Sequence, residues 1–462
     1  MGPSTAEGPE DEQSDELPPQ LDGLPVIGST LDLARDPIGF FDHVAEHGDV
    51  VRYEIGGSDF TIVLHPEYVE QLLVTESESV RKLRLGEVNG ASNEFAPEGV
   101  LFTEGEQWRN QRIMLQNVFT PDRIERYGTT MTDVAACHAE SWDDDEELAI
   151  NRQFSELTLV ILAKTLFDLT IEDRGSGITE VASALNEQAD SSSLSTYLPA
   201  WIPTPAQRRY DRAMSEFETT IDAVIEERRS EDARPLSDRD DLLSLLLTTE
   251  TPNGYRHSER ELRDQLLTFL FAGHEATSLA LTYTVLLVTQ HPAVKKRLRE
   301  EWDDVLGDSD PIPSDVPNLT YTDHVVRESL RLYPPAFAVF RTATEDIGLG
   351  NYVIPDGTNI TIPQFRLHRN PRFYDDPEAF DPDRWTDPPE RPEYAYFPFG
   401  GGPRHCIGMR FAMMELKLVL PTVLRRVEFE LLSDSDPELA PQATLQPAED
   451  VRTRVRTISS LR

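Results

Sequence analysis

One cysteine stands where the chain could hold a metal ion. Cys406 lies in Phe399-Gly400-Gly401-Gly402-Pro403-Arg404-His405-Cys406-Ile407-Gly408, which leads into a predicted helix, Ile407 to Leu424. The backbone N–H groups and the positive dipole at a helix N-terminus stabilise a thiolate, and glycines let such donors approach the sulfur. An inert core cysteine in a flexible loop would explain neither the aromatic residue nor the arginine. The pattern predicts a thiolate metal ligand, with His405 as the nearest rival.

A second chemically active pair lies in the most apolar segment, Glu261 to Gln290. The centre of this segment is apolar on nearly all sides, which indicates burial in a large protein or in a bilayer. His274 and Glu275 fall at its midpoint. Because ionisable groups are costly in lipid, we predict a central helix of a soluble protein rather than a membrane span. An ionisable pair in a buried helix is usually functional.

The segment around Cys406 resembles, position by position, the haem-binding signature of the cytochrome P450 family of haem-thiolate monooxygenases. The resemblance covers roughly Leu17 to Arg462. It implies that Cys406 is the proximal iron ligand of haem b, in a family where thiolate ligation favours O–O cleavage. The other cofactor contacts that it implies come from the same loop: Phe399 packing on it, Gly400 within it, Arg404 on a haem propionate, and Gly408 allowing close approach of a helix.

Two further places match propionate-binding residues of the family. Trp108 and Arg112 are four residues apart and therefore share one helix face. Taken alone, this pair could equally be an aromatic ring stacked on a surface arginine. Arg341 matches an arginine on a strand that follows the helix containing Glu328. Three arginines facing two carboxylates would form a suitable anion site.

Glu328 and Arg331 are three apart on a predicted helix from Tyr321 to Leu332. Alone, such a pair is an ordinary surface ion pair of about 0.2–0.5 kcal/mol. Arg384 precedes the cysteine loop, as an arginine of the family's meander does. The resemblance therefore implies a buried structural triad that supports folding around haem and takes no part in catalysis.

The long helix departs from the family pattern at one position. Ala272-Gly273-His274-Glu275-Ala276-Thr277 matches the oxygen-binding segment, with small residues beside the flat cofactor and Glu275 as the proton-relaying acid. Ala276, also predicted to line the cofactor, replaces the usual threonine and cannot form a hydrogen bond. Thr277, a substrate hydroxyl or a water held by Glu275 could deliver the proton instead. The Thr277 side chain is rotated by about 100° around the helix axis from that of Ala276, so it would need a bridging water to deliver the proton. We favour the water route, because burying Glu275 costs free energy.

The elements that must position these groups are mostly helices. Helical periodicity dominates from about residue 105 to 332, whereas strand-like runs occur at 50–55 and 60–64 and the last quarter is rich in turns. We predict a mainly α fold with a smaller β-rich lobe, and the resemblance places haem between the long central helix and the cysteine loop. Residues 1–16 are expected to be an acidic disordered tail without a signal peptide or anchor. Residues 17–462 would form a single domain, with Cys137 a small core residue.

The charge balance is strongly acidic. The chain of 462 residues has 43 Lys+Arg against 83 Asp+Glu, a net charge of −40, which excludes nucleic-acid binding through a basic face. Acidic residues recur along the whole chain, so one acidic tail or docking patch explains them less well than adaptation of a prokaryotic protein to high salt. Two cysteines far apart indicate a reduced, cytoplasmic protein. Five residues supply all the lysines: Lys82, Lys164, Lys295, Lys296 and Lys417.

The resemblance implies a monooxygenase that inserts one oxygen atom of O2 into an apolar small molecule. The motifs of this chain are most similar to those of family members that act on fatty acids, carotenoids and terpenoids. No flavodoxin-like or ferredoxin-like segment follows, so we expect electrons from a separate ferredoxin-type partner, and a monomer. A peroxide-dependent oxygenase is one alternative, although such relatives usually carry an arginine near Ala276. A non-enzymatic haem-thiolate gas or redox sensor is the other.

Overall fold

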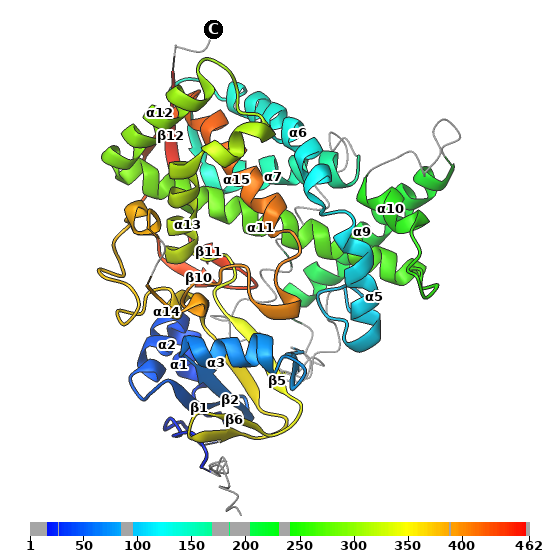
Figure 1. Ribbon diagram of the computed structural model, residues 1–462, viewed down its shortest axis with the longest axis vertical. Helices are drawn as coiled ribbons and strands as arrows, with labels where there is room; N and C mark the ends of the chain where they lie inside the picture. The colour runs from blue at the N-terminus through cyan, green and yellow to red at the C-terminus, as the bar shows by residue number, and fades with distance from the viewer. Residues whose placement is uncertain are drawn as a thin grey trace, which may run out of the picture.

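The computed structural model describes residues 16–25, 27–84, 96–168, 184, 204–230, 241–387 and 390–458. It shows a large helical part and a smaller β-rich part at the N-terminal end, with α11 running through the middle (Figure 1). This confirms the predicted mainly α fold with a β-rich lobe. The described helices are α1 (Thr30–Arg35), α2 (Pro37–Ala45), α3 (Pro66–Glu70), α5 (Gly105–Gln116), α6 (Pro121–Glu140), α7 (Ile150–Leu166), α9 (Pro205–Ser230), α10 (Leu242–Thr248), α11 (Glu259–Gln290), α12 (Pro292–Leu306), α13 (Thr320–Leu332), α14 (Gln364–Leu367) and α15 (Met409–Leu424).

The strands form a main sheet and three smaller ones. The main sheet has the order β1-β2-β8-β5-β3, in which β2 and β8 are parallel and the other neighbours antiparallel. The smaller sheets are β4-β12-β9 and the pairs β6-β7 and β10-β11. The strands are β1 (Val50–Ile55), β2 (Ser58–Val63), β3 (Val80–Lys82), β4 (Glu147–Ala149), β5 (Val339–Ala343), β6 (Ile347–Leu349), β7 (Tyr352–Ile354), β8 (Asn359–Ile362), β9 (Val427–Leu431), β10 (Leu439–Pro441), β11 (Leu445–Pro447) and β12 (Arg452–Thr457).

The central helix α11 begins two residues earlier than its apolar pattern indicates, because a capping box sets the start. The Ser258 hydroxyl accepts the Glu261 N–H at 3.2 Å, and the Glu261 carboxylate accepts the Ser258 N–H at 2.7 Å. Burial raises the pKa of Glu261, but the Ser258 backbone, the Tyr255 hydroxyl and the other donors outweigh it and lower the pKa to about 2. The helix stops at Gln290, because Pro292 begins α12.

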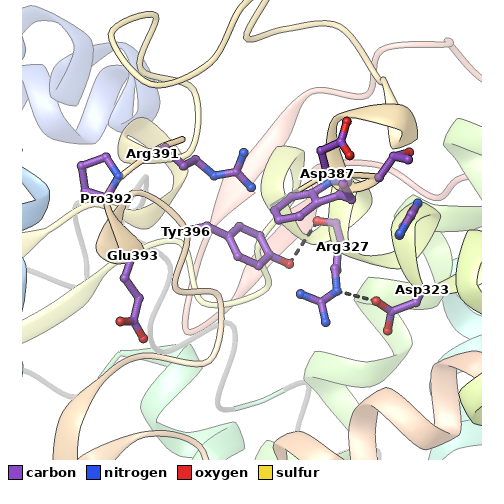
Figure 2. Close-up of a pocket in the computed structure, with 10 residues that line it drawn as sticks. Asp323, Arg327, Asp387, Arg391, Pro392, Glu393 and Tyr396 are labelled. Carbon is purple, nitrogen blue, oxygen red and sulfur yellow. Dashed lines mark hydrogen bonds and ion pairs between the residues drawn. The ribbon is translucent and has the colours of Figure 1, made fainter. Parts of the chain in front are cut away.

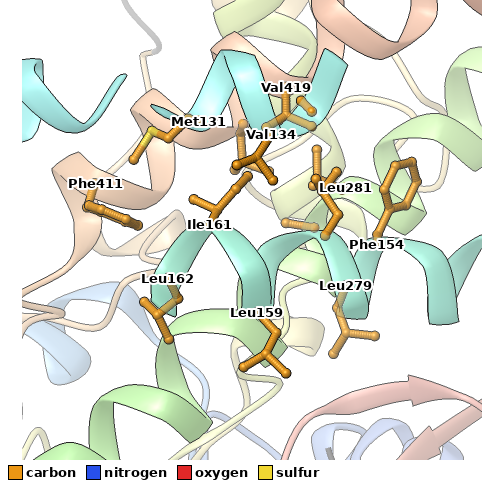
Figure 3. Close-up of a cluster of buried hydrophobic side chains, with 14 of the residues drawn as sticks. Met131, Val134, Phe154, Leu159, Ile161, Leu162, Leu279, Leu281, Phe411 and Val419 are labelled. Atoms are coloured by element: carbon orange, nitrogen blue, oxygen red, sulfur yellow. The ribbon is translucent and has the colours of Figure 1, made fainter. Parts of the chain in front are cut away.

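The helical part buries one large apolar cluster around α11. Side chains from α6, α7, α11 and α15 meet there, among them Met131, Phe154, Leu281 and Val419 (Figure 3). A second cluster lies in the β-rich lobe between the main sheet and α2 and α3. The long helix is therefore held on most of its surface and can place His274 and Glu275 with little freedom.

Three local expectations need correction or fall outside the described residues. Cys137 is exposed on α6, so its assignment to the core was wrong. The helix after the cysteine loop begins at Met409, two residues beyond its expected start, because Ile407 and Gly408 form a turn. Residues 1–15, most of the expected tail, lie outside the described residues. Among the described helices, none combines the length and the apolarity that crossing a membrane requires.

Candidate active site

The loop before α15 is shaped by close contacts that require glycine. Gly400 and Gly402 have φ values of 71° and 62°, which side-chain-bearing residues rarely adopt. A Cβ on Gly402 would also lie 1.7 Å from the Leu73 carbonyl oxygen. The Cys406 N–H donates to the Phe399 carbonyl at 2.8 Å, which closes the loop, and the Phe399 ring packs against the helical core.

Cys406 carries an accessible thiol with donors and cations around it. The pKa of the Cys406 thiol is raised, because burial outweighs the backbone N–H groups of Gly408 and Met409 and the charges of Arg112 and Lys82, which lower it. The residue still keeps accessible surface. A Cβ on Gly408 would lie 3.9 Å from this sulfur, an ordinary distance, and would meet no other described atom within 4 Å. Close approach of a neighbouring helix therefore does not require Gly408 to be glycine.

The rival ligand His405 is engaged elsewhere. Its Nε2 lies 3.2 Å from Arg112 Nη2, and its Nδ1 lies 2.9 Å from the Gly402 carbonyl oxygen. Because the guanidinium can only donate, Nε2 accepts and Nδ1 carries the proton in this arrangement. Both ring nitrogens have partners within the protein, which leaves Cys406 as the residue of this loop that is free to bind a metal ion.

Four cations gather near this thiol around one carboxylate. Lys82 and Arg341 stand directly opposite each other on β3 and β5, a placement of like charges that destabilises a sheet. Burial and the nearby arginines lower the pKa of Lys82 to about 7, and burial and Arg404 lower that of Arg341 to about 10. Glu104 accepts the Lys82 N–H at 3.0 Å and pairs with Arg404. Together with Arg112, the cluster has a surplus of positive charge that a bound anion would balance.

Trp108 joins this cluster through the same helix face as Arg112. Both residues lie on α5, and the Arg404 guanidinium sits over the Trp108 ring at 4.4 Å. Arg112 Nε and Arg404 Nη1 are buried and make no hydrogen bond within the described part of the chain. Buried guanidinium donors normally have acceptors. The structure thus brings together Trp108, Arg112, Arg341, Arg404 and Cys406, as the resemblance implies.

These residues fit a haem. Its two propionates would carry negative charge, which the positive charge that the cations hold in excess over Glu104 would balance. The orphaned donors on Arg112 and Arg404 would gain acceptors. The flat, largely apolar ring would need a smooth surface beside it, and α11 offers one.

On α11 a short open stripe interrupts an otherwise buried helix. Ala272 is exposed and Ala276, one turn later, is half-buried, whereas most residues from 261 to 288 are buried. Gly273, predicted to lie beside the cofactor, also allows a close contact between two helices. A Cβ there would lie 2.8 Å from Leu162 Cδ1, so the absence of a side chain lets α7 pack closely against α11.

The acid on α11 turns toward the C-terminal hairpin. Glu275 is 7% exposed; one of its carboxylate oxygens accepts from Gln446 and is 3.5 Å from the Thr444 hydroxyl. The other oxygen lies 3.6 Å from His274 Nε2. Thr277 is buried and donates its hydroxyl proton to the Gly273 carbonyl at 2.9 Å. The helix backbone therefore already uses the Thr277 donor.

The predicted triad is confirmed as a hydrogen-bonded network in which Glu328 and Arg331 are fully buried and Arg384 is partly buried. Arg331 makes two hydrogen bonds to Glu328, at 3.0 and 2.8 Å, and Arg384 Nε makes a third at 2.8 Å. Trp385 Nε1 and the backbone N–H of Asp381 also donate hydrogen bonds to the Glu328 carboxylate, at 2.9 and 3.1 Å. This arrangement ties α13 to the segment that leads to the cysteine loop.

A polar pocket of about 490 Å³ lies beside this network (Figure 2). Asp323 and Arg327 of α13 form one side of it, and Tyr396 and Arg391 form another. None of the predicted cofactor or catalytic residues lines this pocket, so it is separate from the thiolate site.

Sequence reasoning missed four residues of the site: Lys82, Glu104, Thr444 and Gln446. Lys82 offered one weak signal, because it is one of only five lysines in the chain. The other three carry no local pattern, and only their partners, far away in the chain, give them meaning.

Comparisons with known proteins agree with this geometry. The Cytochrome P450 family profile matches residues 18–452. Cyclooctat-9-en-7-ol 5-monooxygenase of Streptomyces melanosporofaciens is 35% identical, over 87% of each chain. Pentalenene oxygenase of Streptomyces avermitilis is 31% identical, over 94% of this chain and 95% of the relative. The structure of retinoic acid-bound cyanobacterial CYP120A1 matches with a TM-score of 0.85 and 25% identity, covering 96% of this chain and all of that one. With its thiolate loop, cation cluster and central helix in place, the chain belongs to the cytochrome P450 family.

Proposed function

We propose that this cytochrome P450 monooxygenase inserts one oxygen atom of O2 into an apolar isoprenoid, of the terpenoid or carotenoid-derived class. One substrate C–H bond and O2, with two electrons and two protons, would give an alcohol and one water. The observation that carries the proposal is the accessible Cys406 thiol beside a cluster with surplus positive charge. A bound haem would supply the oxygen-activating chemistry.

The residues of the chain have distinct roles in this proposal. Cys406 would ligate the iron, with the backbone donors after it steadying the thiolate. Lys82, Arg112, Arg341 and Arg404 would hold the propionates. Ala272 and Ala276 would leave room beside the ring on α11, and Glu275 would hold and release protons.

The substrate class is supported by two kinds of observation. The relatives are named for cyclooctat-9-en-7-ol and pentalenene, which are terpenoids, and the similar solved structure holds retinoic acid. In the 337–340 segment, which we expect to line the substrate site, the Phe337 and Phe340 rings make an edge contact at 6.3 Å. We also expect the segments 83–100 and 182–201 to line the substrate site, but most of their residues lie outside the described part of the chain. A long-chain fatty acid remains the second substrate class.

Electrons would come from a ferredoxin-type protein. Arg410 is exposed and Met409 is 37% exposed, directly after the cysteine loop, which suits a partner with acidic and apolar groups. Arg404, which lies in the same loop, pairs with Glu104 and stacks on Trp108, so it contributes less to such a surface. We propose a monomer in the cytoplasm, where both free thiols would stay reduced.

The surface charge supports adaptation to salt. Eighty-three acidic residues against 43 basic ones repel one another unless ions screen them. Many exposed arginines are already paired with carboxylates, such as Arg263 with Asp222 at 2.5 Å. We propose a salt-adapted prokaryotic source, with residues 17–462 as one domain after an acidic tail.

The experiment that tests this function compares electron donors and substrates. Purified protein with haem, a ferredoxin, its reductase and NADPH should bind geranylgeraniol or retinoic acid with a shift of the haem spectrum and release a hydroxylated product. Product formed with hydrogen peroxide alone, and none with ferredoxin, would favour the peroxide-dependent alternative. A spectrum that responds to gases without any product would favour the sensor, which the oxygenase names of the relatives argue against.

A further inference from the structure

We propose that Thr444 and Gln446, on the β10–β11 hairpin, are positioning residues for proton delivery and that the Thr444 hydroxyl replaces the alcohol missing at Ala276. This inference rests on the proposed function and deepens it. The family pattern places an alcohol directly after the acid on the central helix. In this chain an alcohol reaches the acid from a different element.

The contacts form a closed triangle around one oxygen of Glu275. The Gln446 amide donates to Glu275 Oε1 and lies 2.8 Å from the Thr444 hydroxyl oxygen. The Thr444 hydroxyl lies 3.5 Å from the same Glu275 oxygen and can donate to it. Glu275 is 7% exposed, so these contacts act where water competes little. The carboxylate is held and also has an adjacent hydroxyl.

The hairpin is fixed firmly enough to position a side chain. The Tyr283 hydroxyl, from the next turns of α11, donates to the Leu445 carbonyl at 2.9 Å. The Leu445 N–H donates to the Pro335 carbonyl, also at 2.9 Å. Tyr283 is fully buried and stacks on Tyr333 at 4.5 Å. Figure 1 shows β10 and β11 beside α11. The residue between Thr444 and Gln446 is thus tied to two other elements.

The second oxygen of Glu275 faces a histidine that orients it further. His274 Nδ1 contacts the Leu270 carbonyl and therefore carries a proton, which leaves Nε2 as an acceptor. Nε2 lies 3.6 Å from Glu275 Oε2, and it has no hydrogen bond among the described residues. One additional proton on either atom would complete this contact. Glu275 is therefore contacted at one oxygen by the hairpin and at the other by His274.

The competing alcohol on α11 is less suited. Thr277 donates its proton to the Gly273 carbonyl and points about 100° away from the face of Ala276. The Thr444 hydroxyl, by contrast, can donate to the Glu275 carboxylate. In each delivery, Glu275 would pass one proton through the Thr444 hydroxyl and take up one from water, so the carboxyl and the hydroxyl both end unchanged.

The first test is a double-mutant cycle on the haem-loaded protein, followed by urea unfolding. If Gln446 acts on Glu275, Gln446→Leu should lower the urea midpoint in the wild-type background and change it much less in a Glu275→Gln background. Gln442→Leu, on the same hairpin, is the matched control and should act equally in both backgrounds. Equal effects of Gln446→Leu in both backgrounds would overturn the contact, whether or not any product is formed.

The second test measures coupling with geranylgeraniol as the substrate and ferredoxin as the donor. Thr444→Val should raise hydrogen peroxide released per NADPH about fivefold, the factor expected when one hydrogen bond is lost. Thr444→Ser keeps the hydroxyl and should stay near wild type. Adding Ala276→Thr to Thr444→Val should restore coupling, which a merely structural role of Thr444 would not predict.

The two hypotheses fail in different ways. A wild-type protein that binds haem but forms no product with any isoprenoid would refute the proposed function, while the urea cycle still decides the hairpin contact. A wild-type protein that forms product, with Thr444→Val equally well coupled and the CO spectrum unchanged, would refute this inference alone. If Thr444→Val loses haem, Thr444→Ser with full coupling and Thr444→Ala with poor coupling decide the same question.

Discussion

Replacing Glu328 by alanine should cost the protein a large part of its stability. Glu328 is fully buried and accepts five hydrogen bonds, three from arginines, one from Trp385 and one from the Asp381 N–H. In Glu328→Ala, Arg331, which is also fully buried, would keep only its bonds to three backbone carbonyls. Removing one partner of a buried ion pair costs about 3–5 kcal/mol. Total stability is about 5–15 kcal/mol.

The matched control is an exposed ion pair. Lys296 Nζ lies 3.4 Å from Glu300 Oε1, and the two side chains are 78% and 59% exposed. Such a pair contributes about 0.3–0.5 kcal/mol, so Glu300→Ala should cost no more than that. The pair should also weaken in salt, because the screening length falls to about 3 Å at 1 M. The buried network should not weaken in the same way.

The assay is urea unfolding of haem-loaded protein, followed by circular dichroism and by the haem absorbance, in low and high KCl. We expect Glu328→Ala to lose about 3 kcal/mol or more at both salt concentrations and to release haem earlier than the wild type. A loss below about 1 kcal/mol, or a loss that vanishes in high KCl as that of a surface pair would, would refute the reasoning. The triad would then be no more than an ordinary ion pair.

The remaining predictions concern the thiolate, the surface and a buried histidine. Cys406→Ser should abolish the thiolate-type spectrum of the reduced CO complex, and Cys137→Ser should leave it unchanged; the opposite result would reassign the ligand. The melting temperature should rise with KCl from about 0.1 to about 3 M, because the 83 acidic residues need screening, and a flat profile would contradict salt adaptation. Burial, then Arg331 and Arg369, lower the pKa of His368 to about 3, while its ring accepts the Phe397 N–H at 3.0 Å. Below pH 6.5, His368 is therefore protonated in the unfolded chain but stays neutral in the folded chain. The free energy of unfolding then falls by about 1.4 kcal/mol per pH unit toward pH 3. Between pH 7.5 and 5, His368→Gln should lose about 2 kcal/mol less than the wild type in urea unfolding, and equal losses would show that His368 is protonated in the fold.

Local patterns in the sequence were enough to identify the central helix and to predict the thiolate ligand. The residues around Cys406 are contiguous, so their order alone indicates the loop and its candidate ligand. The apolar run of α11 marks a buried helix because burial on every side leaves no polar face to interrupt it. The pair Glu328 and Arg331 shares a helix face by spacing alone, which is why its contact could be predicted.

Tertiary structure decided what surrounds those groups. Glu104 meets Arg404 from 300 residues away, and Thr444 meets Glu275 from 169 residues away. Gly273, which its motif places beside the cofactor, also had to make room for Leu162 of α7. Periodicity and spacing report only on neighbours along one element, whereas an isolated Thr or Gln on a hairpin carries no trace of its partner. The sequence therefore indicated the class of chemistry, and the packing of distant segments decided which charged and polar groups surround Cys406 and Glu275.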